Sequence, residues 1–346
     1  MIVDKKYSMS SFLMYRRIVD SQKQFKAGII PNIPDMKFER TGVSNSTELM
    51  ADLKKQVEAA TKDGKAAIAL SGGIDSAILA KFMPKGSTAY TFKCVVPGVK
   101  VTDETEAAAK YAKECGLKHK VVEVYWEDFE KFAPLLMNHK GAPIHSIEVQ
   151  VYKAALQAKA DGFERLIYGE SSDCIFGGLS NLLSKDWLIG DFIERYEFVK
   201  PYKVLKESEL VLDPIQRHER DGHVDPHEFL STEFLPESLG SYVNASETAN
   251  FGVVIPFSRC YLEGDLDYQR IRNGENKYLV REIFNYLFKG FNVPEKRPMP
   301  RATNEWLKDW AGPKRPEFYP HCTDDMSGDQ KWLVMALEMF LNQIED

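Results

Sequence analysis

Two short stretches of the sequence combine glycine, hydroxyl and carboxylate side chains in a pattern that suits phosphate chemistry. The first is S-G-G-I-D-S at residues 71–76, and the second is Y-G-E-S-S-D-C-I-F-G-G at residues 168–178. Backbone N–H groups in a glycine-rich turn before a helix can hold an anion, and the helix dipole favours its charge. Taken alone, residues 71–76 could also carry glycine only for tight packing.

Each stretch also contains an aspartate that could bind a metal ion, Asp75 in the first and Asp173 in the second. Mg²⁺ usually takes one or two carboxylates in addition to phosphate oxygens. A single aspartate at the start of a helix is more often a cap than a ligand. Two aspartates in glycine-serine turns after neighbouring strands favour the metal site, so we predict that Asp75 and Asp173 bind Mg²⁺.

The flanking residues must form the elements that bring these turns together. Apolar runs and helical spacing alternate along the chain. We predict strands at 67–70, 87–96, 120–125 and 165–168, and helices from 46 onward and at 74–82, 103–115 and 146–160. This alternation is typical of a doubly wound, mostly parallel α/β sheet, in which ligands bind at the carboxyl ends of the strands.

The remaining sequence suggests three parts. We expect an N-terminal segment (1–45) that packs on an α/β core (46–180), followed by a mainly helical part (181–346) that completes the substrate site. The net charge of −6 argues against nucleic acid as the main partner. No apolar stretch reaches the length of a membrane span, and no signal peptide is visible. Five scattered cysteines are typical of a cytoplasmic protein with reduced thiols.

The two stretches together resemble the signatures of a known superfamily. S-G-G-I-D-S resembles the PP-loop of the N-type ATP pyrophosphatases, whose fold is that of the adenine nucleotide alpha hydrolases. G-E-S-S-D-C-I-F-G-G is similar to G-E-G-S-D-E-x-F-G-G of the asparagine synthetase class, with Ser171 and Cys174 as departures. Further segments resemble the synthetase domain of that class: 11–29, 91–98, 244–257 and 276–284, the last being similar to its K-x-x-L-R helix.

The resemblance implies an ATP-dependent, AMP- and pyrophosphate-forming ligase that adenylates a small-molecule carboxylate and transfers ammonia or an amine to it. It assigns Glu170 to position the nitrogen nucleophile or take its proton, with a solvated turn residue as the alternative. Asp75 and Asp173 would hold Mg²⁺. The residues implied in binding ATP are Leu70, Ser71, Gly72, Gly73, Asp75, Ser76, Cys94 and Gly169.

Members of this class also use a lysine after the K-x-x-L-R helix to stabilise charge that develops on phosphate. The corresponding region, 293–306, offers Lys296, Arg297 and Arg301. We favour Lys296 and Arg301 as catalytic residues, although three cations between prolines could also form a solvated surface loop.

Departures from the class pattern bear on the substrate. Ser258-Arg259 follows the P-F pair where leucine and aspartate are usual, and residues 206–234 match no part of the pattern. H-x-x-x-H at 223–227 is interpreted as a loop, because Pro226 would break a helix between the two histidines. These departures make aspartate an unexpected substrate and favour a specialised metabolite or a uronic-acid-type surface sugar.

Glutamine-dependent members carry an N-terminal glutaminase domain with a cysteine nucleophile. Met1 is followed by Ile2 and no cysteine precedes Cys94, so we expect a synthetase domain without it. A separate glutaminase subunit is then a candidate source of ammonia. Two alternatives stay open: a catalytically silent or partner-dependent subunit of an amidotransferase complex, and a PP-loop enzyme that modifies RNA. The second usually needs paired or catalytic cysteines and basic extensions, which are not seen.

Overall fold

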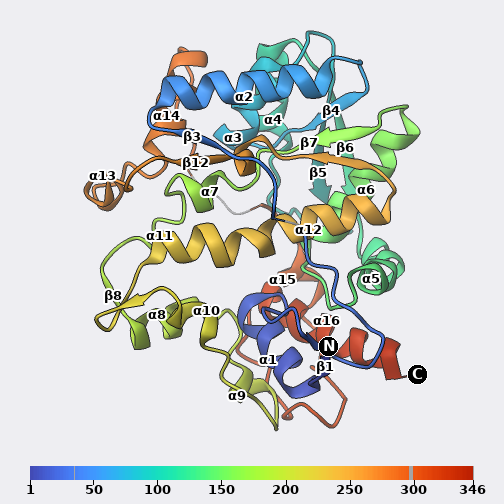
Figure 1. Ribbon diagram of the computed structural model, residues 1–346. Coiled ribbons are helices and arrows are strands. Elements are labelled where there is room, and N and C mark those ends of the chain that lie inside the picture. Colours follow the sequence, from blue (N-terminus) through green and yellow to red (C-terminus); the bar gives the residue numbers. More distant parts are fainter. Residues whose placement is uncertain (35, 296–298, 346) are drawn as a thin grey trace.

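Five parallel strands form the central sheet, in the order β11-β7-β4-β5-β6 (Figure 1). The structure is a computed structural model that describes residues 1–34, 36–295 and 299–345. The strands are β4 (Ala66–Ala69), β5 (Thr88–Cys94), β6 (Lys118–Val124), β7 (Arg165–Ile167) and β11 (Gly252–Val254). All four residues of β4 are buried, as expected for a central strand covered on both faces. The predicted α/β fold with a parallel sheet is therefore confirmed.

The chain runs from β4 through β5 to β6 and then returns to β7, on the other side of β4. Right-handed crossovers place the connecting helices of two such halves on opposite faces of the sheet. Helix α3 packs with α2, α4 and α14, whereas α6 packs with α5 and α12. The strand order thus reverses between β4 and β7, and ligands of open α/β sheets bind outside the carboxyl ends at this point.

These helices include the four that the sequence patterns predicted, α2, α3, α4 and α6. Their bounds are α2 (Ser46–Thr61), α3 (Ile74–Phe82), α4 (Thr105–Cys115), α5 (Trp126–Lys140), α6 (Ile147–Ala160), α12 (Leu235–Thr248) and α14 (Tyr278–Leu287). The predicted helices and strands are confirmed to within about three residues. Helix α5, which contains Pro134, and the edge strand β11 were not predicted.

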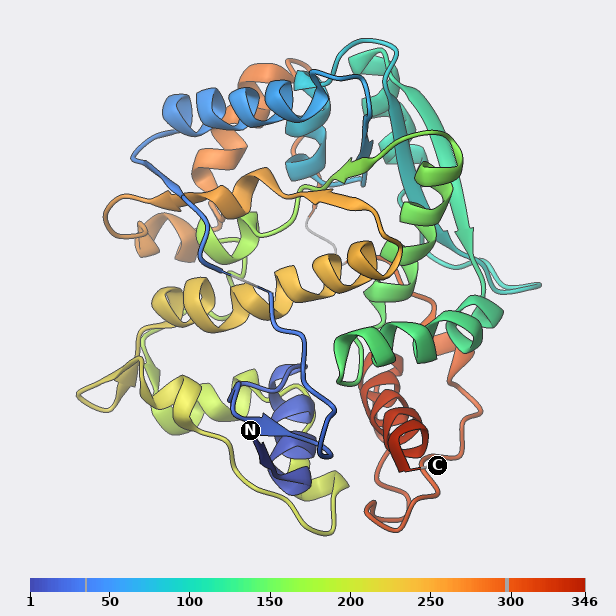
Figure 2. The same ribbon diagram turned by 45° about the vertical axis from the view of Figure 1, so that its right-hand side comes forward.

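The N-terminal segment lies against the end of the chain. It contains β1 (Ile2–Val3), α1 (Lys5–Tyr15), β2 (Lys23–Gln24) and β3 (Thr41–Val43). Helix α1 packs on α16 (Gly328–Glu345), and β3 pairs in parallel with β12 (Cys260–Leu262). Figure 2 shows this segment at the bottom of the molecule beside the C-terminal helix, before the chain rises to α2. The division into three parts stays a prediction, and β11 shows that residues after 180 also extend the main sheet.

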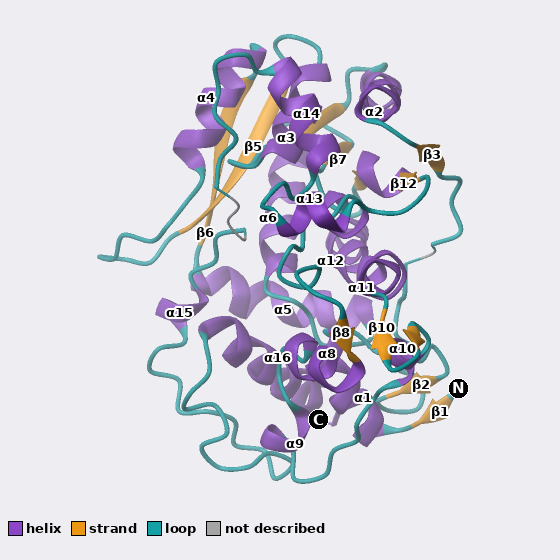
Figure 3. Cartoon of the chain, turned by 90° about the vertical axis from the view of Figure 1, so that its left-hand side faces the viewer, coloured by secondary structure: helices purple, strands orange, loops and turns teal. Residues whose placement is uncertain are grey.

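Helix α12 crosses the middle of the molecule, between the sheet and the lower helices (Figure 1). Figure 3 shows the main strands in the upper half and small strand pairs among the lower helices. The remaining elements are α7 (Ser172–Ile175), β8 (Trp187–Leu188), α8 (Ile189–Tyr196), α9 (Pro201–Val204), α10 (Asp213–Gln216), β9 (Glu219–Arg220), β10 (His223–Val224), α11 (Pro226–Phe229), α13 (Tyr268–Arg272) and α15 (Thr303–Trp306). Among the described residues, no helix has the length and apolar character needed to cross a membrane.

Candidate active site

Residues 71–76 form the turn that joins β4 to α3. The Ser71 N–H donates to Ser76 Oγ at 3.0 Å, and the Gly73 N–H donates to Ser71 Oγ at 3.1 Å. Gly73 is the N-cap of α3, and no side chain in the described part of the chain caps this helix. The first N–H groups of α3 are therefore suited to an anion, as the sequence predicted.

The second turn packs directly on the first because Gly169 has no side chain. A Cβ on Gly169 would lie 2.6 Å from Ser76 N and 2.9 Å from the carbonyl carbon of Asp75. Since these are backbone atoms at the start of α3, a larger residue would force the two turns apart. Gly169 therefore sets the distance between the two predicted phosphate- and metal-binding turns.

Ser171, one of the departures from the class signature, has a left-handed backbone with φ of +76° and ψ of −15°. Glycine adopts this conformation without strain, whereas an L side chain at such a position costs about 1–2 kcal/mol. The class signature has glycine at this position, which suits the left-handed backbone. In this chain Ser171 adopts the same conformation with strain. The serine side chain is buried at the start of α7.

The carboxylates of Asp75 and Asp173 meet at one cation, the ammonium group of Lys277. Lys277 Nζ lies 2.6 Å from Asp75 Oδ2 and 2.9 Å from Asp173 Oδ1, and Ser172 Oγ donates to Asp75 Oδ1 at 2.5 Å. Burial lowers the pKa of the Lys277 ammonium, but the two carboxylates outweigh burial and hold this pKa above its usual value. Lys277 is therefore a buried, charged partner of both predicted metal ligands.

Lys277 lies in the class-like segment 276–284 and was not among the predicted site residues. It is the N-cap of α14 with a left-handed backbone, φ +52° and ψ +43°, and its N–H donates to the carbonyl of Gly177. The backbone of Lys277 is thus tied to the same loop as Asp173. The lysine of the K-x-x-L-R pattern was the sequence signal for this contact.

The donor set of this cluster fits Mg²⁺ under one condition. Two carboxylates converge on one position, and Mg²⁺ prefers such oxygens together with those of a bound phosphate. However, Asp75 Oδ2 and Asp173 Oδ1 both contact Lys277 Nζ. Asp75 and Asp173 could therefore hold Mg²⁺ together only if the Lys277 ammonium moves away from them.

Glu170 lies between the second turn and α12. Its Oε1 accepts hydrogen bonds from Ser238 Oγ at 2.6 Å and from the Ser171 N–H at 2.9 Å, and its Oε2 accepts one from the Tyr242 hydroxyl at 3.0 Å. Ser238 and Tyr242 are one helical turn apart on α12. Burial raises the pKa of Glu170, and these hydrogen bonds partly oppose the increase. Neither Ser238 nor Tyr242 was predicted as a site residue.

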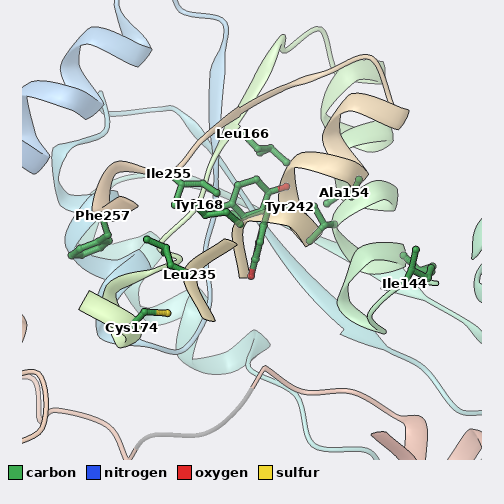
Figure 4. Packing of buried hydrophobic residues seen from close by; sticks show 14 of the residues in the cluster. Ile144, Ala154, Leu166, Tyr168, Cys174, Leu235, Tyr242, Ile255 and Phe257 are labelled. Atoms are coloured by element: carbon green, nitrogen blue, oxygen red, sulfur yellow. The ribbon is translucent and has the colours of Figure 1, made fainter. Parts of the chain in front are cut away.

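These groups surround a cavity of about 620 Å³ at the reversal of strand order. Tyr168 and Tyr242 both line this cavity, and their rings pack edge to face with centroids 4.9 Å apart. Figure 4 shows the two rings close together. The cavity brings together most of the predicted site residues: Leu70, Ser71, Gly72, Gly73, Asp75, Ser76, Gly169, Glu170, Asp173 and Arg301.

One predicted residue is placed differently. Cys94 is buried, its Sγ lies 3.9 Å from the carbonyl oxygen of Pro300, and it is not part of the cavity wall, although Thr91 and Phe92 are. Burial raises the pKa of the Cys94 thiol to about 11. Lys296 lies outside the described residues.

Arg301 lines the cavity and pairs with Asp329 on α16, with Nη2 and Oδ2 2.9 Å apart. Thr303 Oγ1 donates to the other oxygen of Asp329 at 2.8 Å. Asp329 therefore fixes Arg301 at the wall of the cavity from a helix far along the chain.

The interpretation of residues 223–227 as a loop was wrong. His223 belongs to β10, and Pro226 is the first residue of the short helix α11, a position where its missing N–H is harmless. His223 is exposed, whereas His227 Nε2 lies 2.9 Å from the carbonyl oxygen of Ile175. The two rings thus contact different groups.

Comparison with known proteins gives one family match. The model of the asparagine synthase family matches residues 48–248 of this chain. Among solved structures, NMN synthetase from Francisella tularensis is similar to 74% of this chain over 100% of its own length, with 13% identity and a TM-score of 0.28. That likeness is too weak to support an argument about this protein. No curated protein sequence matches the chain.

Proposed function

The chain belongs to the asparagine synthase family, and we propose that it is an AMP-forming amide synthetase for a small-molecule carboxylate. Membership of this family supports an ATP-dependent ligase that forms an amide or an adenylate. The nature of the acid, the use of ammonia or an amine, and the release of pyrophosphate are parts of the proposal.

In the first step, a carboxylate oxygen of the substrate attacks the α-phosphorus of ATP. The bond to the bridging oxygen breaks, and pyrophosphate leaves with its electron pair. The N–H groups of 71–76 and the start of α3 would hold the phosphates. Asp75 and Asp173 would bind Mg²⁺, which neutralises charge on the leaving group when bound. Arg301 would stabilise negative charge at the cavity wall.

In the second step, ammonia or an amine attacks the acyl carbon, and the C–O bond to AMP breaks. The nitrogen loses a proton, for which the carboxylate of Glu170 is the candidate acceptor. A raised pKa suits this role, because a base works best when its pKa is close to the working pH. Ser238 and Tyr242 would fix the carboxylate by their hydrogen bonds.

One observation carries the proposal. Asp75 and Asp173 converge within 3 Å of one Nζ, and Glu170 opens into the same cavity from the second turn. Two turns far apart in sequence thus place a phosphate cradle, a carboxylate pair and a candidate base around one space. This is the arrangement that adenylation followed by amine attack requires.

The test is exchange of labelled pyrophosphate into ATP, measured with Mg²⁺ across a panel of carboxylic acids. We expect exchange with at least one acid, and amide formation when ammonium or an amine is added. Asp75→Asn should abolish exchange while circular dichroism stays unchanged. An Asp75→Asn protein that still exchanges pyrophosphate would contradict the proposed roles of the two turns.

The same measurement separates the alternatives. A catalytically silent or partner-dependent subunit would show no exchange on its own. The RNA-modifying alternative has little support, since four of the five cysteines, Cys94, Cys115, Cys174 and Cys260, are buried and Cys322 is half-buried. A separate glutaminase subunit stays a candidate source of ammonia, and its effect would appear as glutamine-dependent product formation in the mixed proteins.

A further inference from the structure

Three side chains of the cavity wall carry polar atoms without a partner in the part of the chain that the structure describes. They are the amide of Gln150, the hydroxyl of Tyr168 and Nε of Arg301. Gln150 is 1% exposed and Tyr168 is 3% exposed. Two neutral groups and one cation of the same wall therefore have hydrogen-bonding capacity that no other described residue uses.

Among the described residues, the unpaired amide of Gln150 is the strongest of these three observations. It lies on α6, and both its Oε1 and its Nε2 are buried without a hydrogen-bond partner among the described residues. Buried polar side chains are nearly always hydrogen-bonded, and an unmet buried donor or acceptor costs about 1–3 kcal/mol. Because Gln150 lines the cavity, a ligand bound there is the candidate partner of its amide.

The donors and acceptors of Gln150 and Tyr168 restrict the chemical groups that such a ligand can present to them. A hydroxyl group both donates and accepts, and can therefore pair with either atom of the Gln150 amide and with the Tyr168 hydroxyl. A second carboxylate only accepts, and it would add negative charge to a cavity that already contains Glu170 and Asp329. An alkyl chain would leave the amide of Gln150 unpaired.

We propose that Gln150 and Tyr168 form a subsite for the hydroxyl groups of a hydroxylated carboxylic acid. This inference rests on the proposed function, since it names the class of acid that the synthetase would activate. Arg301 supplies the positive charge of the same wall. The acid is thus expected to be polar and neutral apart from its reacting carboxylate, as a sugar acid is.

The test compares acids that differ in their hydroxyl groups. Pyrophosphate exchange is measured with a hexuronic acid, a simple α-hydroxy acid, its alkyl counterpart without the hydroxyl and an amino dicarboxylic acid. We expect the highest kcat/KM with a hydroxylated acid. Gln150→Met keeps the length of the side chain but removes both polar atoms, and should lower kcat/KM for that acid about tenfold to hundredfold, mainly through KM.

The same helix provides a matched control. Gln157 also lies on α6, but its side chain is exposed and donates to Asp161. Gln157→Met makes the same chemical change on the same helix away from the cavity, and should leave the KM for the acid unchanged. The KM for ATP should be unchanged in both variants, which a general loss of structure in Gln150→Met would not allow.

Binding of the same acids, measured by calorimetry without ATP, separates this inference from the proposed reaction. Binding of a hydroxylated acid that Gln150→Met weakens, without exchange in the natural protein, would support the subsite and overturn the proposed reaction. Exchange with an unchanged KM in Gln150→Met would support the reaction and show that Gln150 is only hydrated. Preference for the alkyl or dicarboxylic acid, or absence of both binding and exchange, would overturn the subsite.

Discussion

Replacement of Lys277 by methionine tests how the two turns are held together. Lys277 is 7% exposed at the side chain, against 17% for Asp75 and 32% for Asp173. Methionine fills a similar volume but removes the charge, so the two carboxylates would face each other without a cation. We therefore expect a clear loss of stability and a stronger response to Mg²⁺.

The geometry sets the size of the effect. At an effective dielectric constant of about 20, ion pairs at these distances correspond to a gross attraction of about 6 kcal/mol each. Desolvation of the lysine offsets much of this gain, and removing one partner of a buried pair typically costs about 3–5 kcal/mol. Because Asp173 is partly exposed, we expect the lower end, about 3 kcal/mol, or roughly 1 M in the urea midpoint.

The assay is urea unfolding at pH 7 with and without Mg²⁺. At ten times its dissociation constant, Mg²⁺ bound to the vacated pair would restore about 1.4 kcal/mol in Lys277→Met. The natural protein should respond less, since its own ammonium contacts both carboxylates. Lys110→Met, which removes an exposed partner of Glu106, is the control and should leave the midpoint unchanged. A loss below about 1 kcal/mol, or equal Mg²⁺ responses, would refute the reasoning.

Three further predictions concern single contacts. Tyr242→Phe removes a hydrogen bond that lowers the pKa of Glu170, so the acid limb of the pH–rate profile for amide formation should move to higher pH; a limb that moves to lower pH would contradict this role. Ser171→Gly should raise the free energy of unfolding by up to about 1 kcal/mol, because relief of the left-handed strain exceeds the added entropy of the unfolded chain; a lower free energy of unfolding would show that the serine is not strained. The hydrogen bond from Arg315 lowers the pKa of Glu317 to about 2, so ionised Glu317 stabilises the fold fully above about pH 4.5 and this stabilisation is lost toward pH 2. In Glu317→Gln the free energy of unfolding should therefore change less with pH between about 4.5 and about 2. An unchanged pH dependence in this window would contradict the prediction.

The sequence predicted the α/β core well because its signals are local. Short apolar runs before glycine-rich turns defined the strands, and apolar residues at helical spacing defined the helices. In the structure Asn45 caps α2 by accepting from the Glu48 N–H. Helix α5 was missed, and it contains Pro134, a residue that usually breaks helices. Strand β11 has only three residues and depends on pairing with β7, which local sequence does not encode.

In the candidate site, too, the residues of local motifs could be predicted and those brought in by tertiary packing could not. The two turns are contiguous motifs, so most of their residues could be named from sequence. Lys277, Tyr242 and Gln150 reach the cavity from three separate helices or their caps. Their proximity depends on tertiary packing. Lys277 lies in the class-like segment 276–284, which was its sequence signal, whereas the residues beside Tyr242 and Gln150 give no such signal. The role of Cys94 in binding ATP stays a prediction, although Thr91 and Phe92 of the same class-like segment line the cavity and Cys94 does not.

The pairing of Arg301 with Asp329 has a consequence for the protein during its synthesis. Asp329 belongs to α16, the last helix of this chain, while the two turns are made far earlier. Domains begin to fold from the N-terminus as the chain emerges. The sheet and the phosphate cradle can therefore form on the ribosome before Arg301 is held in place. A nascent chain in which α16 has not yet formed could bind ATP at the cradle, but its Arg301 would not yet be held at the cavity wall.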